Sequence, residues 1–205
     1  MHKINADLRV IRTKEAIRQA LVELINEKGF KAITVKDITA RAKINRGTFY
    51  AHYQDKFDLM TKCEEEIMFD MSRLTQQSYP SVIAALEADA QTLIPFSFTV
   101  SLFEYLNINR GFMKAVLGPN GDLTFQTRLK EFMWETLYGN KPDAFVKEEN
   151  ILVPGQYLAS YMGAAIIGVI QQWLESGTKE SPLEMARILT TITINGPFFA
   201  AGLKK

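Results

Sequence analysis

The sequence contains few residues of the kinds that carry catalysis or bind metals. It has one cysteine, Cys63, and two histidines, His2 and His52, which are far apart in the chain. A single cysteine excludes an internal disulfide framework and suits a reducing compartment. We find no catalytic set and no glycine-rich phosphate loop, and the run Glu64-Glu65-Glu66 is more typical of a solvated helix face than of a metal site. The sequence therefore predicts no enzyme, no metal and no cofactor.

Long hydrophobic runs are also missing. The longest apolar stretch, around Tyr157–Ile170, is shorter than the roughly 18–20 residues that a membrane span needs. A polar, charged segment follows Met1, so no signal peptide is expected. We therefore expect a cytoplasmic protein without a membrane partner.

The near-neutral net charge of +1 hides an uneven distribution. Residues 1–62 hold 13 Lys/Arg and 7 Asp/Glu, a balance of +6, whereas residues 63–205 hold 11 and 16, a balance of −5. A basic first third and an acidic remainder indicate two surfaces with different partners, nucleic acid among them. Solvated helix faces would also account for this pattern.

Apolar residues recur at helical spacing almost throughout, and no segment alternates as a strand would. The sequence predicts an all-α chain of nine or ten helices. The first should run from Arg9 to Lys28 and stop at Gly29. Further helices are expected at about 35–42, 46–53, 56–77, 81–94, 96–106, 110–117, 122–138, 154–177 and 182–195.

Residues 34–53 read as a helix-turn-helix motif, supported by the first helix of the chain. Thr34 should cap the first short helix, with Asp37 as its capping-box partner, and Asn45 should cap the second. Asp55 should cap the long helix that follows. In such a unit the second short helix enters the major groove of DNA, and the first crosses the backbone.

The residue types of the second short helix suit that task. Phe49 would anchor it, which leaves Arg46, Thr48, Tyr50 and His52 on its other faces. Arginine can bind the edge of a guanine bidentately, and the threonine methyl can touch that of a thymine. Tyrosine and histidine donors suit phosphate oxygens.

Gly47 would allow a close backbone approach near this helix's N-terminus. Lys56, in the first turn of the next helix, is unfavourable beside the positive end of the helix dipole. A phosphate would reverse that sign, so Lys56 is either half of a phosphate clamp or a plain exposed lysine.

Residues 10–71 resemble the DNA-binding domain of the TetR/AcrR transcriptional regulators. The match includes "TKEAIRQALVELINEKGFKAITVKDITARAKINRGTFYAHYQDKFDL". The resemblance implies a homodimer that binds a palindromic double-stranded DNA operator. It also implies a larger domain, 72–205, for effector binding and dimerisation. The DNA-binding positions that it implies are Thr34, Arg46, Gly47, Thr48, Tyr50, Ala51, His52, Tyr53 and Lys56. Many members carry an aromatic residue where this chain has Ala51.

The run "YLASYMGAAIIGVIQQWLESG" followed by "SPLEMARIL" is similar to the last two helices of a Firmicutes-type branch of the family. Those helices build a four-helix dimer interface. Small residues such as Ala164, Ala165 and Gly168 would let helices approach closely, although an interior helix of a monomer would look similar. The predicted interface residues are Gly163, Ile166, Ile167, Ile170, Trp173, Leu189 and Ile192.

The aromatic-rich middle of the chain is, by the same resemblance, a pocket for a small, largely apolar effector. Plain core packing explains the same residues. The candidate pocket residues are Phe103, Tyr105, Trp134, Tyr138, Tyr157 and Tyr161. The function that the sequence predicts is a ligand-responsive repressor. Activation, a helical carrier or adaptor that no longer binds DNA, and an enzyme that uses the middle pocket remain as alternatives.

Overall fold

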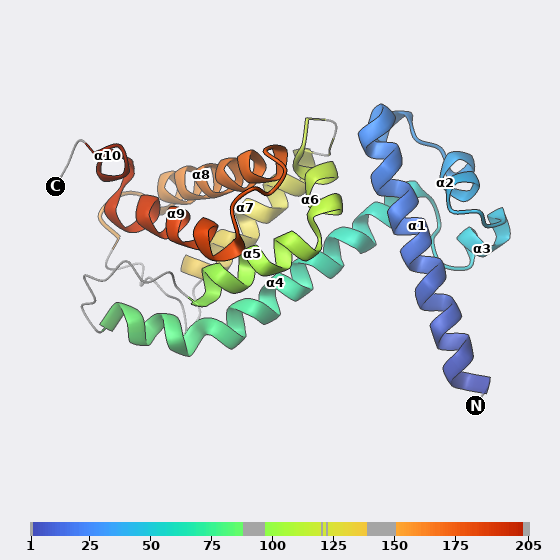
Figure 1. Cartoon of the computed structure of the whole chain (residues 1–205), viewed down its shortest axis with the longest axis horizontal. Coiled ribbons are helices and arrows are strands. Elements are labelled where there is room, and N and C mark those ends of the chain that lie inside the picture. The colour runs from blue at the N-terminus through green and yellow to red at the C-terminus, as the bar shows by residue number, and fades with distance from the viewer. Residues whose placement is uncertain (1, 88–96, 120, 122, 139–150, 203–205) are drawn as a thin grey trace. The chain divides into compact units, whose positions relative to one another are not determined.

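The structure is a computed structural model, and it describes residues 2–87, 97–119, 121, 123–138 and 151–202. Ten helices and no strand occur among these residues, so the all-α prediction is confirmed (Figure 1). The chain forms two compact units. The first comprises Met1–Ile67 with Gly111–Phe125, and the second comprises Met68–Arg110 with Gln126–Lys205. The boundary at Ile67 lies near the predicted one at 71, but residues 111–125, predicted in the second domain, group with the first unit.

In the first unit, α1 (His2–Ala32) begins earlier than predicted and is interrupted at Gly29, where φ is 74°. That left-handed backbone conformation favours glycine, so the predicted stop at Gly29 is confirmed. The buried face of α1 includes Ile17, Leu21 and Ile25, each 0% exposed. Each such side chain contributes about 1.5–3 kcal/mol of burial free energy.

The next two helices follow as the cap residues predict. Helix α2 spans Val35–Arg41 and α3 spans Arg46–Tyr50, which ends α3 three residues before the predicted Tyr53. Both lie beside α1 (Figure 1). The α6 helix (Arg110–Leu117) also packs here, because the Arg18 guanidinium lies 4.8 Å from the centroid of the Phe112 ring.

Helix α4 (Lys56–Glu87) begins in the first unit and ends in the second. Its cap is as predicted, since Asp55 Oδ1 accepts hydrogen bonds from the amides of Phe57 and Asp58, both at 2.8 Å. The predicted break before Pro80 is wrong, because α4 continues through it. Proline holds a φ close to that of a helix, and its cost is the loss of one backbone hydrogen bond and a steric conflict with the preceding turn.

The second unit contains α5 (Ser97–Ile108), most of α7 (Leu123–Tyr138), α8 (Gly155–Glu175), α9 (Pro182–Asn195) and the short α10 (Pro197–Ala200). The helix α10 was not predicted. The α5 helix packs against both α8 and α9, and the edge-to-face pair of Phe103 and Trp173, 5.2 Å between centroids, lies in this core. Among the helices of the described ranges, none is both long and apolar enough to cross a membrane.

Candidate nucleic-acid interface

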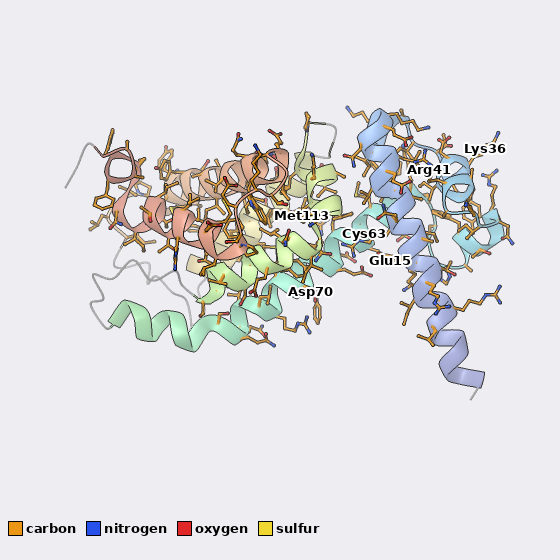
Figure 2. The ribbon with its side chains drawn as sticks, in the orientation of Figure 1. Glu15, Lys36, Arg41, Cys63, Asp70 and Met113 are labelled. Carbon is orange, nitrogen blue, oxygen red and sulfur yellow. The ribbon has the colours of Figure 1, made fainter. Side chains whose placement is uncertain are left out.

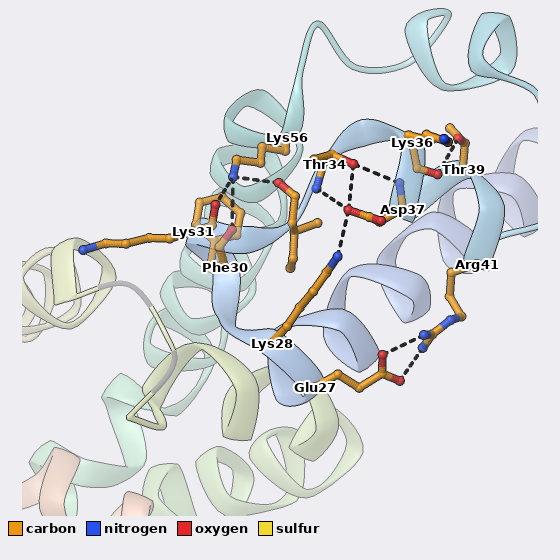
Figure 3. Close-up of polar contacts among 11 residues, drawn as sticks. Glu27, Lys28, Phe30, Lys31, Thr34, Lys36, Asp37, Thr39, Arg41 and Lys56 are labelled. Carbon is orange, nitrogen blue, oxygen red and sulfur yellow. Dashed lines mark hydrogen bonds and ion pairs between the residues drawn. The ribbon is translucent and has the colours of Figure 1, made fainter.

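Helix α2 is fixed at its start by a capping box. The amide and hydroxyl of Thr34 donate to Asp37 Oδ2 at 2.8 and 2.6 Å, and the Asp37 amide donates to Thr34 Oγ1 at 3.2 Å. Lys28 adds an ion pair to the same carboxylate oxygen at 2.9 Å (Figure 3). The hydrogen bonds from Thr34, and then Lys28, hold the pKa of Asp37 well below its ordinary value. The predicted cap and its partner are confirmed.

A second set of ion pairs ties α2 to α1. The guanidinium of Arg41 donates to Glu27 at 2.7 Å and to Glu23 at 2.9 Å. The hydrogen bond from Arg41 lowers the pKa of Glu27, and hydrogen bonds from Gln19 and then Arg41 lower that of Glu23. Arg41 lies toward α1, whereas Lys36 points outward from α2 (Figure 2). These exposed pairs are individually weak, and they connect the end of α2 to α1.

Helix α3 is held at its N-terminus by Asn45 and beneath by Phe49. The Asn45 side-chain oxygen accepts from the Thr48 amide at 2.7 Å and from its hydroxyl at 3.0 Å. Phe49 is 0% exposed. A Cβ at Gly47 would lie 3.3 Å from the Asn45 oxygen that makes this cap, so glycine leaves that oxygen room. The predicted cap and anchor are therefore confirmed.

The remaining faces of α3 and the turn after it form a surface that we call the α3 surface. Arg46, Gly47, Tyr50 and Ala51 are exposed, and Thr48 and His52 are half-buried. Arg46 donates a hydrogen bond to the Tyr50 hydroxyl at 3.2 Å, one helical turn away. The predicted DNA-contact residues of α3 thus lie together on one accessible surface. Thr34, also exposed, lies at the start of α2.

Tyr53 does not belong to this surface. Its side chain is 6% exposed and packs on Phe49, with ring centroids 5.6 Å apart. Burial raises the pKa of Tyr53 to about 12. The prediction that Tyr53 lies beside the phosphates is corrected, because the ring is part of the core beneath α3.

The structure also corrects the role predicted for Lys56. Its ammonium donates to the backbone carbonyls of Phe30, Lys31 and Ile33 at 3.1, 3.0 and 2.8 Å (Figure 3). An ammonium has three protons, so these three acceptors use all of them. Lys56 therefore fixes the connection between α1 and α2 and has no donor left for a phosphate clamp.

Two residues that hold α3 were not predicted from the sequence. The ammonium of Lys62 donates to the carbonyl of His52 at 3.1 Å and to Asp58 Oδ2 at 2.9 Å. Asp58 Oδ2 also accepts from the Gln54 amide at 2.8 Å. The spacing of Asp58 and Lys62, four residues apart on one helix, is the sequence signal that could have indicated this pair.

The predicted effector-pocket residues have different surroundings in the second unit. Phe103 is fully buried against Trp173, and the Tyr105 hydroxyl donates to Asp70 Oδ2 at 3.2 Å. Trp134 is half-buried, and the Tyr138 side chain lies outside the described residues. Tyr157 and Tyr161 are 67% and 58% exposed. The structure thus places these two tyrosines on an outer face of α8, and their assignment to an interior pocket is corrected.

Most predicted dimer-interface residues are buried within the second unit. Ile167, Ile170, Trp173 and Leu189 are 2–7% exposed, and Gly163 is covered by Lys130, whose Cγ would lie 2.8 Å from an added Cβ. Ile166 and Ile192 are half-buried. The exposed positions of α8 are instead Gln156, Tyr157, Ser160, Tyr161, Ala164, Ala165, Gly168, Gln172 and Glu175. The predicted face of α8 is therefore corrected.

Two family models match this chain. One, described as bacterial regulatory proteins of the tetR family, matches residues 17–63, and the other, described as a transcriptional regulator C-terminal region, matches residues 95–195. A relative described as the uncharacterized HTH-type transcriptional regulator YxbF of Bacillus subtilis (strain 168) is 28% identical over 185 residues. That match covers 88% of this chain and 44% of the relative. In this and two other curated relatives, the match covers about half or less of the relative's own length.

Solved structures share the fold. NalD of Pseudomonas aeruginosa, the secondary repressor of the MexAB-OprM multidrug efflux pump, aligns with a TM-score of 0.62 at 17% identity. The alignment covers 91% of this chain and 97% of NalD. FadR of Bacillus subtilis, in complex with stearoyl-CoA, aligns with a TM-score of 0.60 at 16% identity. This alignment covers 89% of this chain and 98% of FadR.

The motif at α2 and α3 and the matched family models define a transcriptional regulator of the helix-turn-helix class. A helix-turn-helix alone occurs in many classes of regulator, whereas both matched family models describe regulators of the TetR type. The chain belongs to the TetR family of transcriptional regulators, as its resemblance predicted.

Proposed function

We propose that this chain is a homodimeric repressor that binds a palindromic DNA operator through α3 and is released by a small-molecule effector. The observation that carries the proposal is the α3 surface. Its helix is capped by Asn45, anchored by Phe49 and held by Lys62, and it presents Arg46 and Tyr50 to solvent. A rigid helix with an exposed arginine is what direct reading of base edges requires.

Each predicted contact has a role in this proposal. Arg46 binds the O6 and N7 edge of a guanine, and the Thr48 methyl touches a thymine. Tyr50 and His52 donate to phosphate oxygens, and Thr34 lies where the start of α2 meets the backbone. Gly47 and Ala51, both exposed and small, allow the helix to approach the bases closely.

The proposed dimer uses the exposed face of α8. Ala164, Ala165 and Gly168 would let a second helix approach closely. Tyr157 and Tyr161 are also exposed and lie nearer the start of α8. On α9, Ile188 and Ile194 are 41% and 54% exposed and add apolar area. In a symmetric dimer the two α3 helices would read half-sites roughly 34–36 Å apart.

The proposed effector is small and largely apolar. Support comes from FadR of Bacillus subtilis, a protein of the same fold that was solved with stearoyl-CoA. Phe103, Tyr105 and Trp134 are the candidate residues for the effector pocket in the second unit, since they combine apolar area with buried or half-buried positions. Mass spectrometry of small molecules that co-purify with the native protein would identify the bound compound.

Selection of bound sequences from random DNA tests the DNA-binding part directly. We expect enrichment of a palindrome whose half-sites are one helical turn apart. Fluorescence anisotropy with the selected DNA at several salt concentrations should show strongly salt-dependent binding, because phosphate contacts release counterions. A chain that enriches no sequence would instead be a carrier or adaptor. A reporter gene placed behind the selected operator separates repression from activation.

A further inference from the structure

The first unit contains an open groove between the start of α1 and the turn that joins α2 to α3. Its volume is about 530 Å³. The residues that line it are Leu8, Arg9, Arg12, Thr13, Ala16 and Ile44. Ile44 directly precedes Asn45, which caps α3, so the groove lies beside the N-terminal end of the α3 surface.

The polar chemistry of this groove comes from two arginines. Arg9 and Arg12 are three residues apart on α1, so they share one face of the helix. The Thr13 hydroxyl donates its proton to the Arg9 carbonyl at 2.8 Å, so it has no donor left for an anion. Leu8, Ala16 and Ile44 are apolar. What the groove offers to a ligand is thus an apolar floor with two guanidinium groups.

The other arginines of the first unit have partners within the chain. Arg18 is ion-paired with Glu66, and Arg41 is ion-paired with Glu23 and Glu27. Arg46, on the α3 surface, donates a hydrogen bond to the Tyr50 hydroxyl. Arg9 and Arg12 form no ion pair with any residue whose side chain the structure describes. Two like charges one turn apart repel each other, and an anion bound between them removes that repulsion.

The shape of the groove favours an extended anion over a small molecule. Small-molecule sites bury most of the ligand surface, whereas Arg9 and Arg12 are exposed and Leu8 is 46% exposed. The first fourteen residues also carry four basic side chains (Lys3, Arg9, Arg12 and Lys14) against one acidic residue, Asp7. We propose that this groove binds the sugar–phosphate backbone of DNA beside the base pairs that α3 reads. This inference rests on the proposed function.

The double substitution Arg9→Ala with Arg12→Ala tests the groove. Because each phosphate contact contributes roughly 0.9 to the slope of log K against log salt, the slope should become shallower by about 1.8 per protomer. Affinity should fall by a similar factor for the selected operator and for unrelated DNA, since backbone contacts carry no sequence information. Both quantities are measured by fluorescence anisotropy across a series of salt concentrations.

Three further variants control the experiment. Arg9→Lys with Arg12→Lys keeps both charges and should retain most of the slope. Arg9→Gln with Arg12→Gln removes both charges but keeps part of each alkyl stem. It therefore repeats the test with less change in the packing of α1. Arg110→Ala with Lys179→Ala removes the same charge from exposed positions of the second unit and should leave the slope unchanged. Circular dichroism and thermal unfolding verify that each variant is folded.

The possible failures are distinguishable. If the wild-type chain binds DNA and the double alanine variant keeps its affinity and slope, the groove proposal is wrong while the proposed function stands. A loss confined to the operator would also overturn it, because that result assigns the arginines to base reading. A wild-type chain that binds no DNA at any salt concentration overturns both proposals.

Discussion

The hydrogen bonds of Lys56 make the substitution Lys56→Met a sensitive test of how the first unit is built. Methionine keeps most of the alkyl stem but removes the ammonium from the carbonyls of Phe30, Lys31 and Ile33. A hydrogen bond to a charged group contributes roughly 1.5–3 kcal/mol. Water can replace the ammonium at the more exposed of the three carbonyls. We therefore expect the free energy of unfolding to fall by about 1.5–3 kcal/mol in total.

Urea unfolding followed by circular dichroism measures this change, and anisotropy with operator DNA supplies the second readout. If Lys56 fixes the α1–α2 connection, stability falls while the salt dependence of DNA binding is unchanged at temperatures where the variant is folded. A phosphate clamp predicts the reverse: unchanged stability, and a slope about 0.9 shallower for each protomer. That second pattern would refute the structural role. Lys31→Met is the matched control, because Lys31 is exposed and forms no ion pair among the described side chains.

Four other substitutions give separate tests. Arg46→Ala should weaken operator binding by about 1–3 kcal/mol and relax specificity at one base pair, whereas an equal loss on all sequences would assign Arg46 to phosphate. Phe49→Ala should lower the free energy of unfolding by roughly 3–5 kcal/mol, measured in urea, because its ring is fully buried. The pKa of Asp37 is lower in the folded chain than its ordinary 3.8, so its stabilising contribution is present above that pH and is lost as the pH falls below it. Asp37→Asn should flatten this part of the stability–pH profile, and an unchanged profile would contradict the assignment. Ala164→Glu should shift the chain toward monomer in analytical ultracentrifugation, and an unaffected dimer would exclude this face of α8.

The features predicted correctly from the sequence are those fixed by residues close together in the chain. The caps at Thr34, Asn45 and Asp55 were predicted because each cap and its amide partners lie within three residues of one another. The stop at Gly29 follows from a conformation that only glycine adopts readily. Burial of Phe49 followed because it was the apolar residue available to anchor a short polar helix.

The errors have a different physical origin. Lys56 contacts carbonyls more than twenty residues away, and no local pattern predicts such a pairing. Glu64 was expected on a solvated face but is 4% exposed, because α4 turns it inward beside Cys63 and Ile67. Tyr53 has a hydroxyl that suits a phosphate, yet the apolar area of its ring outweighs the polar tip.

Helix α8 shows the limit of hydrophobic periodicity most clearly. It is apolar on more than one face, so the sequence cannot say which face packs inside the subunit. The structure turns Ile167, Ile170 and Trp173 inward and leaves Ala164 and Gly168 exposed. The face that remains available to a partner therefore combines these small residues with Tyr157 and Tyr161, whereas the large aliphatic residues lie inside.

The contacts at the start of α4 have a consequence for cooperativity. Lys56 binds the backbone that precedes α2, Lys62 binds the backbone at the end of α3, and Asp58 binds the amide of Gln54. Opening α2 or α3 alone would break hydrogen bonds that belong to α4. The most protected amides of these segments should therefore share one free energy of opening in native-state hydrogen exchange, as a single cooperative folding unit. An effector that weakened DNA binding would then have to displace this unit as a whole, because no single helix within it can yield separately.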